Sequence, residues 1–276
     1  MEKKNKMETM HMQKLVINMS LPLIVSLLVQ SLYNIVDSIF VAKMSEEALT
    51  ATSLAFPVQM LMIAFSVGTS VGVNALLSKT LGARNRERAT KIANTSIMLA
   101  LIGGAVFSLT GIFFAQKLAR SFTTVESTAA LCADYLSICM IFCFGNFIET
   151  MLQRFLQAAG NTVLSMCSLI AGAVTNIILD PILIFGLFGF PALGIRGAAI
   201  ATVIGQWLGA AVALLLNRFC NREVIVDFRG FCPEKEIIFG IYKVGLPNII
   251  TQAISSVMVT LVNQILMPLS MSAVAF

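Results

Sequence analysis

Long apolar segments recur along almost the whole chain, and they constrain its fold more than any other feature. They fall at about 15–42, 48–78, 92–115, 131–158, 163–188, 196–217 and 239–267. Each is at least as long as the ~20 residues that an α-helix needs to cross a bilayer. Only 12% of the 276 residues are charged, against about 25% in soluble domains. The pattern predicts an all-α, polytopic membrane protein with seven spans.

The basic residues predict how these spans are oriented. Fifteen of the 19 Lys and Arg residues fall in or beside the N-terminal tail and the second, fourth and sixth connections, and four fall in the alternate connections. Cytoplasmic loops carry an excess of Lys and Arg. We therefore expect a cytoplasmic N-terminus and a cytoplasmic sixth connection. Because these residues are spread over several loops, the net charge of +5 does not indicate nucleic-acid binding.

An internal repeat predicts two related lobes. When Leu21-Pro22 is aligned with Leu246-Pro247, at an offset of 225 residues, six of 37 positions are identical. Both Leu-Pro pairs lie near the start of a span that runs outward, so the repeat would be parallel, with its axis along the membrane normal. We expect an N-terminal six-helix lobe at 1–217, a cytoplasmic inter-lobe loop at 218–238, and the first helix of an incomplete second lobe at 239–276.

Two acidic residues lie in the outer half of the spans. An ionised carboxylate in hydrocarbon is costly unless it is paired, so an acid inside a span indicates a functional site. From a rise of ~1.5 Å per residue, Asp37 lies roughly 6 Å and Asp180 roughly 10 Å below the outer ends of the first and fifth spans. Asn176 precedes Asp180 by one helical turn and shares its face. Thr202 of the sixth span lies at a similar depth.

These side chains predict a shared cation site. Tyr135, near the outer start of the fourth span, could reach the same level, and Asn34 faces much the same way as Asp37. Carboxylate, amide and hydroxyl oxygens, with no Lys or Arg at that depth, suit a hard cation or a proton. The alternative is that Asp37 and Asp180 are separate, each neutral or hydrogen-bonded for packing.

Other polar groups are less specific. Glu149 lies in the inner half of the fourth span near Gln153 and Arg154, where a local ion pair and a contact with substrate are equally good interpretations. Gly68-Thr-Ser-Val-Gly72 is a small-residue stretch of the kind that packs helices together. The six cysteines include no Cys-x-x-Cys pair, and the single histidine lies in the polar N-terminal segment. We therefore expect packing cysteines and no permanent metal site.

Several short motifs together resemble one transporter family. They are Tyr33-Asn-Ile-Val-Asp-Ser-Ile-Phe-Val, Gly82-Ala-Arg-Asn, Gln157-Ala-Ala-Gly-Asn-Thr, Asn176-x-x-x-Asp180-Pro and Gly197-Ala-Ala-Ile-Ala-Thr202. In combination, and over essentially the whole chain, they resemble the multidrug and toxic compound extrusion (MATE) family. Members of that family have twelve helices in two six-helix lobes and export cationic, lipophilic compounds by Na+ or H+ antiport.

The resemblance implies a function, a location and a site. The protein would be a cation-coupled (Na+ or H+) antiporter exporting cationic lipophilic drugs and toxic compounds from the bacterial cytoplasmic (inner) membrane. It would be present here as a C-terminally truncated chain. Carried over by position, the cation-coupling residues would be Asp37, Asn176, Asp180 and Thr202 and, more loosely, Tyr135. No cofactor is implied beyond the coupling ion, and a transient Na+ would be held by the first four residues.

Other functions fit the sequence less well. A flippase for lipid-linked oligosaccharides or polymers, from the same superfamily, would favour a cationic groove, and the spans have no excess of Lys or Arg. An intramembrane aspartyl protease resembles a Gly-x-Gly-Asp setting, whereas Asp180 follows Ile-Ile-Leu. A seven-helix receptor conflicts with the internal repeat and the cytoplasmic N-terminus. We expect a transporter, not an enzyme, with the lipid bilayer, small cationic or lipophilic substrates and a second lobe as partners, and no nucleic acid.

Overall fold

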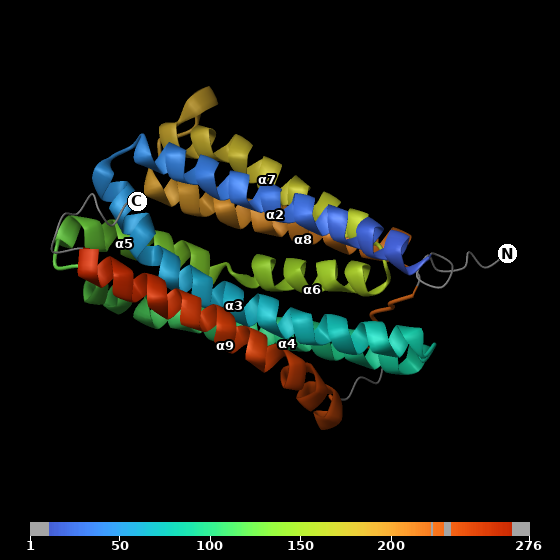
Figure 1. Cartoon of the computed structure of the whole chain (residues 1–276). Helices are drawn as coiled ribbons and strands as arrows, with labels where there is room; N and C mark the ends of the chain where they lie inside the picture. Colours follow the sequence, from blue (N-terminus) through green and yellow to red (C-terminus); the bar gives the residue numbers. More distant parts are fainter. Residues whose placement is uncertain (1–10, 222, 229–232, 267–276) are drawn as a thin grey trace.

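The computed structural model describes residues 11–221, 223–228 and 233–266, and in this part of the chain the regular structure is all helical (Figure 1). The expected all-α, polytopic class is confirmed. The helices are α2 (Met12–Ala42), α3 (Glu46–Gly82), α4 (Arg86–Phe122), α5 (Glu126–Ile141), α6 (Phe144–Ala158), α7 (Thr162–Phe185), α8 (Ile195–Cys220) and α9 (Lys235–Leu266), with a short 3-10 helix η1 (Leu187–Gly189) after α7.

Six of these helices are long and apolar enough to cross a membrane, and the pair α5–α6 adds a seventh candidate. Six expected segments therefore correspond to continuous helices. The fourth, expected as one span at 131–158, differs from the prediction. It is broken between Ile141 and Phe144, and its two halves are bent by 47°.

The break has a local cause, because α4 supplies hydrogen-bond partners to it. The Ser108 hydroxyl donates to the carbonyl oxygen of Ile141 at 3.0 Å, and the Cys143 thiol donates to the carbonyl oxygen of Gly104 at 3.4 Å. A side chain that enters the helical hydrogen-bond ladder is one of the few causes of a sharp kink. The fourth span contains no proline, so the strongest sequence signal of a helix kink is absent.

Local signals fix where several helices begin and end. Ser45 Oγ accepts from the N–H of Ala48 at 3.0 Å before α3, and Asn85 Oδ1 accepts from the N–H of Arg88 at 3.0 Å before α4. Such caps satisfy N–H groups that have no partner within the helix. Gly186 ends α7 in the left-handed region, with a φ of 74°, a conformation that glycine adopts without strain.

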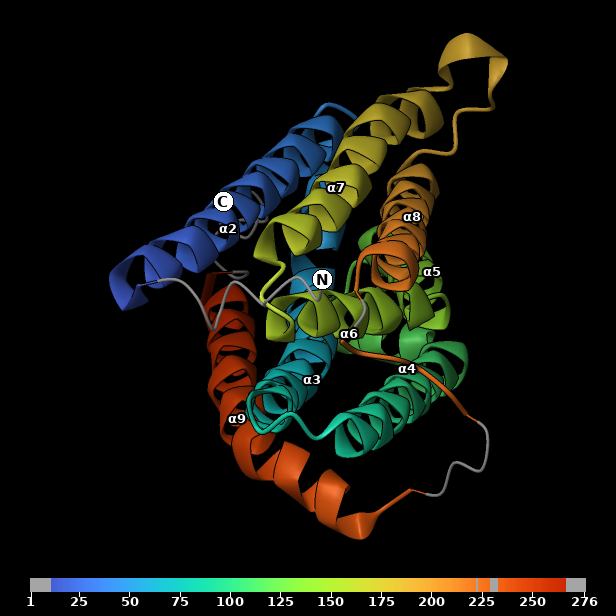
Figure 2. The ribbon, with the colours of Figure 1, turned by 90° about the vertical axis from the view of Figure 1, so that its right-hand side faces the viewer.

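The helices form two groups with α6 between them. In Figure 1, α2, α7 and α8 lie on one side of α6, and α3, α4 and α9 lie on the other; the view turned by 90° in Figure 2 shows the same separation. One buried core joins α3 with α5 and α8 around Leu136, and a second joins α3, α4 and α6 around Phe155. Asp37 on α2 and Asp180 on α7 lie in the same one of these two groups (Figure 1).

Small residues let α9 pack closely on α3. A Cβ added to Gly72 would lie 2.0 Å from the carbonyl oxygen of Ile241, and one added to Gly68 would lie 2.2 Å from Ile249 Cγ1. Farther along the seam, the Ser256 hydroxyl of α9 donates to a carbonyl oxygen of α3. The small-residue stretch at 68–72 is therefore a packing face, as its sequence predicts.

Candidate cation site

Two carboxyl groups meet in the interior, one from α2 and one from α7. The side chains of Asp37 and Asp180 lie within hydrogen-bonding distance of each other. Asp180 is fully buried, and Asp37 Oδ1 is buried without a hydrogen-bond partner among the described residues. Two carboxylates this close repel each other strongly when both are ionised. The arrangement is therefore stable with a shared proton or a bound cation.

Asn176 connects Asp180 to α8. When its amide is oriented so that both ends are satisfied, Nδ2 donates to Asp180 Oδ2 at 3.0 Å and Oδ1 accepts from the N–H of Thr202 at 3.1 Å. In the opposite orientation, Nδ2 lies 3.3 Å from both Asp180 Oδ1 and Thr202 Oγ1. Hydrogen-bond partners decide between such orientations. In both of them, Asn176 bridges the acid and the threonine.

Close packing of α7 against α8 makes this bridge short. A Cβ added to Gly172 would lie 2.9 Å from the carbonyl oxygen of Gly205, and a Cβ added to Gly205 would lie 2.9 Å from the carbonyl oxygen of Gly172. A Cβ on Gly205 would also lie 3.2 Å from the Asn176 Cβ. Small residues at a helix interface allow such an approach, and they set the separation of the polar side chains on the two helices.

Tyr33 belongs to the site although the sequence interpretation did not include it. Its side chain lies near Thr202 and close enough to both acids to interact with them electrostatically. Tyr33 precedes Asp37 by one helical turn, so the same-face rule could have identified it. Asn34, which was expected to face the site, is exposed; that expectation is wrong because the face of α2 that meets α7 excludes it.

Tyr135 is almost fully buried beside Asp37, and α3 holds it there. Gln59 Nε2 donates to the Tyr135 hydroxyl at 3.4 Å. The Cys139 thiol lies near both Gln59 and Tyr135. Nothing in the sequence around Gln59 or Cys139 signals this contact, because it depends on how α3 packs against α5. The site thus draws side chains from five helices.

The residues brought together fit a small cation. They offer oxygen atoms from two carboxyl groups, one amide and the hydroxyl groups of Tyr33 and Thr202, which are the ligands that hard cations and protons prefer. The ion pair between Asp134 and Arg196, at 2.9 Å, is exposed and joins α5 to α8 elsewhere. Among the described residues, no group of three His, Cys, Asp or Glu side chains could hold a metal ion.

Glu149 lies outside this site, on α6. Gln153 Nε2 donates to Glu149 Oε1 at 3.0 Å. Arg154 instead donates from Nε to Ser70 Oγ at 3.1 Å and from Nη1 to Gln157 Oε1 at 2.7 Å. The local ion pair that the sequence left open for Glu149 is therefore wrong, since its neighbour Arg154 is turned to other partners.

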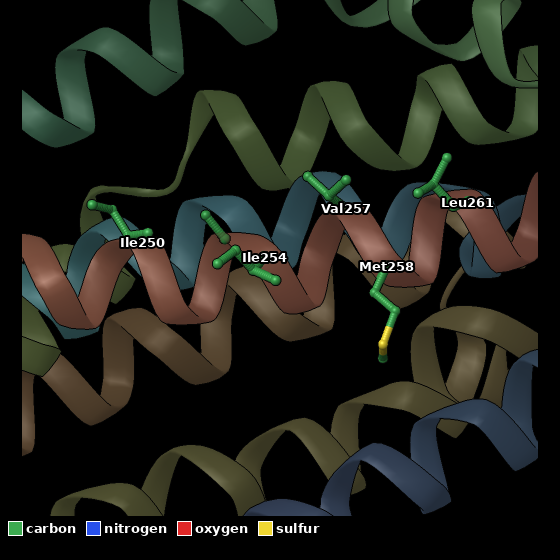
Figure 3. A pocket seen from close by; sticks show the side chains of 6 residues that line it. Ile250, Ile254, Val257, Met258 and Leu261 are labelled. Atoms are coloured by element: carbon green, nitrogen blue, oxygen red, sulfur yellow. The ribbon is translucent and has the colours of Figure 1, made fainter.

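An uncovered apolar surface lies on α9 (Figure 3). It borders a groove of about 420 Å³ that is lined by Ile250, Ala253, Ile254, Val257, Met258 and Leu261. All six side chains come from one helix and none is polar. A continuous exposed apolar surface of this kind marks a site that lipid, protein or an apolar ligand covers.

Known proteins are similar to the chain in both sequence and fold. The model of the MatE family matches residues 22–182. The "Probable multidrug resistance protein YoeA" of Bacillus subtilis (strain 168) is 31% identical over 248 residues, which cover 86% of this chain and 53% of the relative. The "Multidrug export protein MepA" of Staphylococcus aureus (strain bovine RF122 / ET3-1) is 28% identical over 236 residues, 85% of this chain and 51% of the relative.

A solved structure leads to the same family. The outward-facing conformation of a multidrug resistance MATE family transporter of the MOP superfamily matches with a TM-score of 0.83 and 30% identity, over 92% of this chain and 56% of that chain. The chain spans about half the length of the curated relatives it matches. Since the family model covers more than half of the chain and includes both Asp37 and Asp180, this multi-pass membrane protein belongs to the MatE family.

Proposed function

We propose that the protein acts in cation-coupled multidrug export, with Asp37 and Asp180 together binding the coupling ion, Na+ or H+. The observation that carries this proposal is the contact between the two carboxyl groups inside a membrane lobe. Intramembrane acids are costly and are kept chiefly for function. The names of the relatives, which refer to multidrug resistance and export, support export as the activity.

The position of α2 links cation binding to movement. Of its 31 residues only Pro22, Ser26 and Val41 are buried, so the helix is held mainly along one narrow face. An empty pair of carboxylates would repel and push α2 from α7, and a bound cation would hold the two together. A cation shifts such an equilibrium only by its differential affinity for the two arrangements. Pro22, which removes a helical hydrogen bond, is a natural bending point.

The substrate would lie between this lobe and a second lobe to which α9 belongs. The groove on α9 is wholly apolar, which favours lipophilic compounds. A flippase for lipid-linked sugars or polymers would need cationic side chains for its anionic substrate, and the lining of the groove has none. The bacterial relatives support the cytoplasmic membrane as the location, and the distribution of Lys and Arg supports an N-terminus in the cytoplasm.

Drug efflux from membrane vesicles of bacteria that express the complete gene tests the proposal. Under an imposed Na+ or H+ gradient, Asp180→Asn should lower gradient-driven efflux about tenfold or more, equivalent to at least about 1.4 kcal/mol. The matched control is Asp134→Asn, which removes a carboxylate from the exposed pair with Arg196 and should leave efflux near the parent rate. If Asp180→Asn transports at the parent rate with the same ion dependence, Asp180 is a packing residue.

A further inference from the structure

Glu149 is a second interior acid, and the Asp37–Asp180 pair does not account for it. Its one side-chain partner among the described residues is the neutral amide of Gln153, at 3.0 Å. An ionised carboxylate withdrawn from water needs a counter-charge or several donors. A single neutral donor supplies neither, so this setting favours the protonated acid.

The carboxyl group is fitted against the backbone of α8. A Cβ added to Gly209 would lie 2.3 Å from Glu149 Oε1 and 3.0 Å from Oε2, so a larger residue at this position would displace the acid. The Glu149 side chain is only partly buried. A proton bound there can therefore exchange with the space beside the lobe.

The helices packed on α6 bring no compensating charge to Glu149. Helices α3, α4 and α8 carry charged residues only near their ends, and the interior acid of α7 is Asp180. The Cys143 thiol, at the break before α6, donates to the carbonyl oxygen of Gly104. Asn146, one turn before Glu149, has a buried Nδ2 without a hydrogen-bond partner among the described residues, which leaves a further donor on the same stretch of α6.

The neighbouring cation, Arg154, is stabilised independently of Glu149. It donates to Ser70 and Gln157, and it lies in the last turns of α6, where the negative end of the helix dipole favours a positive charge. Protonation of Glu149 would therefore not leave Arg154 without partners. The two residues are neighbours in sequence but separate in their interactions.

We propose that Glu149 is a second proton-binding group of the lobe, distinct from the Asp37–Asp180 pair. A proton fits better than a metal ion, because one carboxyl group beside amide donors offers too few oxygen ligands for a hard cation. Gly209, which Glu149 contacts, follows Thr202 by seven residues, or about 10 Å along α8. Glu149 is thus a proton station, meaning a second position at which a proton can bind, between the Asp37–Asp180 pair and the membrane surface at which α6 ends. That role in transport, unlike proton binding itself, rests on the proposed function.

Carbodiimide labelling of the purified chain tests proton binding without any transport assay. A hydrophobic carbodiimide reacts with a protonated carboxyl group in apolar surroundings: the acid proton passes to a carbodiimide nitrogen, and the carboxylate oxygen adds to the central carbon. At pH 7, mass spectrometry should find about tenfold more label on Glu149 than on Asp134, whose side chain is partly exposed and pairs with Arg196. The label on Glu149 should fall as the pH is raised.

Variants separate this site from the cation pair. Labelling of Glu149 should be unchanged in Asp180→Asn and absent in Glu149→Gln. Glu149 that stays unlabelled at pH 7 in the parent protein would overturn the proposal, and this result needs no variant that must fold. In vesicles with an imposed H+ gradient, Glu149→Gln should lower drug efflux about tenfold, or about 1.4 kcal/mol. If Glu149 is labelled as expected in the parent protein but Glu149→Gln exports drug at the parent rate, the station role alone is overturned. This holds whatever the efflux of Asp180→Asn.

Discussion

Asp180 lies in an eleven-residue run, 176–186, in which Asn176 is the other residue with a polar side chain. The structure buries it completely and surrounds it with Asn176 from its own helix and Asp37 from α2. An interior acid of this kind is tolerated when its charge is neutralised or shared. The charge state of Asp180 therefore depends on its partner acid and on whatever cation the pair holds.

A prediction at the residue scale concerns the Thr202 hydroxyl, whose oxygen lies 3.3 Å from the amide nitrogen of Asn176 in one of the two amide orientations. Thr202→Val keeps the shape and the backbone N–H that the Asn176 amide oxygen contacts but removes one hydroxyl oxygen from the site, so it should weaken cation binding by about 1 kcal/mol, or roughly fivefold. The measurement is the cation concentration that gives half of the thermal stabilisation of the purified protein. The matched control is Thr175→Val, because that hydroxyl bonds only to a carbonyl oxygen of its own helix, at 2.7 Å. Equal effects of the two changes would contradict a role for Thr202 in the site.

The sequence allowed part of this site to be predicted. Helical spacing placed Asn176 beside Asp180, and equal depth placed Asp37 and Thr202 near them; the structure brings all four together. Depth and spacing say nothing about which face of a neighbouring helix turns inward. That is why Gln59 could not be predicted and why Asn34 was assigned to the site wrongly.

Among the helices, the α5–α6 break and the α3–α9 seam show two different limits of prediction. Apolar length identified the fourth span, but its bend depends on Ser108 of another helix, which no pattern within the span encodes. The seam depends on glycines of α3 itself, so the small-residue stretch at 68–72 could be identified in advance. A helix-packing face can be recognised in the sequence by its small residues. A contact from a side chain of a neighbouring helix cannot be recognised in the sequence of the span that bends.

The α3–α9 seam makes a prediction at the element scale. Gly72→Ala would place a methyl group against the carbonyl oxygen of Ile241, so it should destabilise the folded protein by about 1–3 kcal/mol. Gly82→Ala is the control in the same helix, since nothing lies within 4 Å of a Cβ there, and it should be neutral or stabilising by up to about 1 kcal/mol. Thermal unfolding in detergent compares them. Unchanged stability in Gly72→Ala would mean that α9 does not pack on α3 as described.

For the whole molecule, the ion pairs at one end of the helices bear on its orientation. Arg88 pairs with Glu236 at 3.0 Å and Lys91 pairs with Glu234 at 2.9 Å, which places the start of α4 beside the start of α9. The second and sixth connections therefore lie at the same face of the molecule. Both carry many of the basic residues that mark cytoplasmic loops.

Fusions to a topology reporter test this orientation. A reporter fused after Arg229 should read cytoplasmic, and one fused after Phe190 should read external, because the basic residues concentrate in the connection that contains Arg229. A fusion after Ala83, in the second connection, is the control and should match the one after Arg229. The reverse pattern would contradict a cytoplasmic N-terminus.

The Asp37–Asp180 pair affects the whole molecule, because one contact between two residues would set the position of α2 and with it the arrangement of the lobe. The parent protein, Asp37→Asn, Asp180→Asn and the double variant should be compared for thermal stability at rising Na+ concentration and at falling pH. A ligand that binds only the folded state stabilises it, by about 2.7 kcal/mol at a hundred times its Kd.

A shared site predicts that Na+ or acid raises the Tm of the parent protein, that each single variant loses this rise, and that the double variant loses no more than either single one, since the two acids act as a unit. A full rise in both single variants, or losses that add in the double variant, would contradict it.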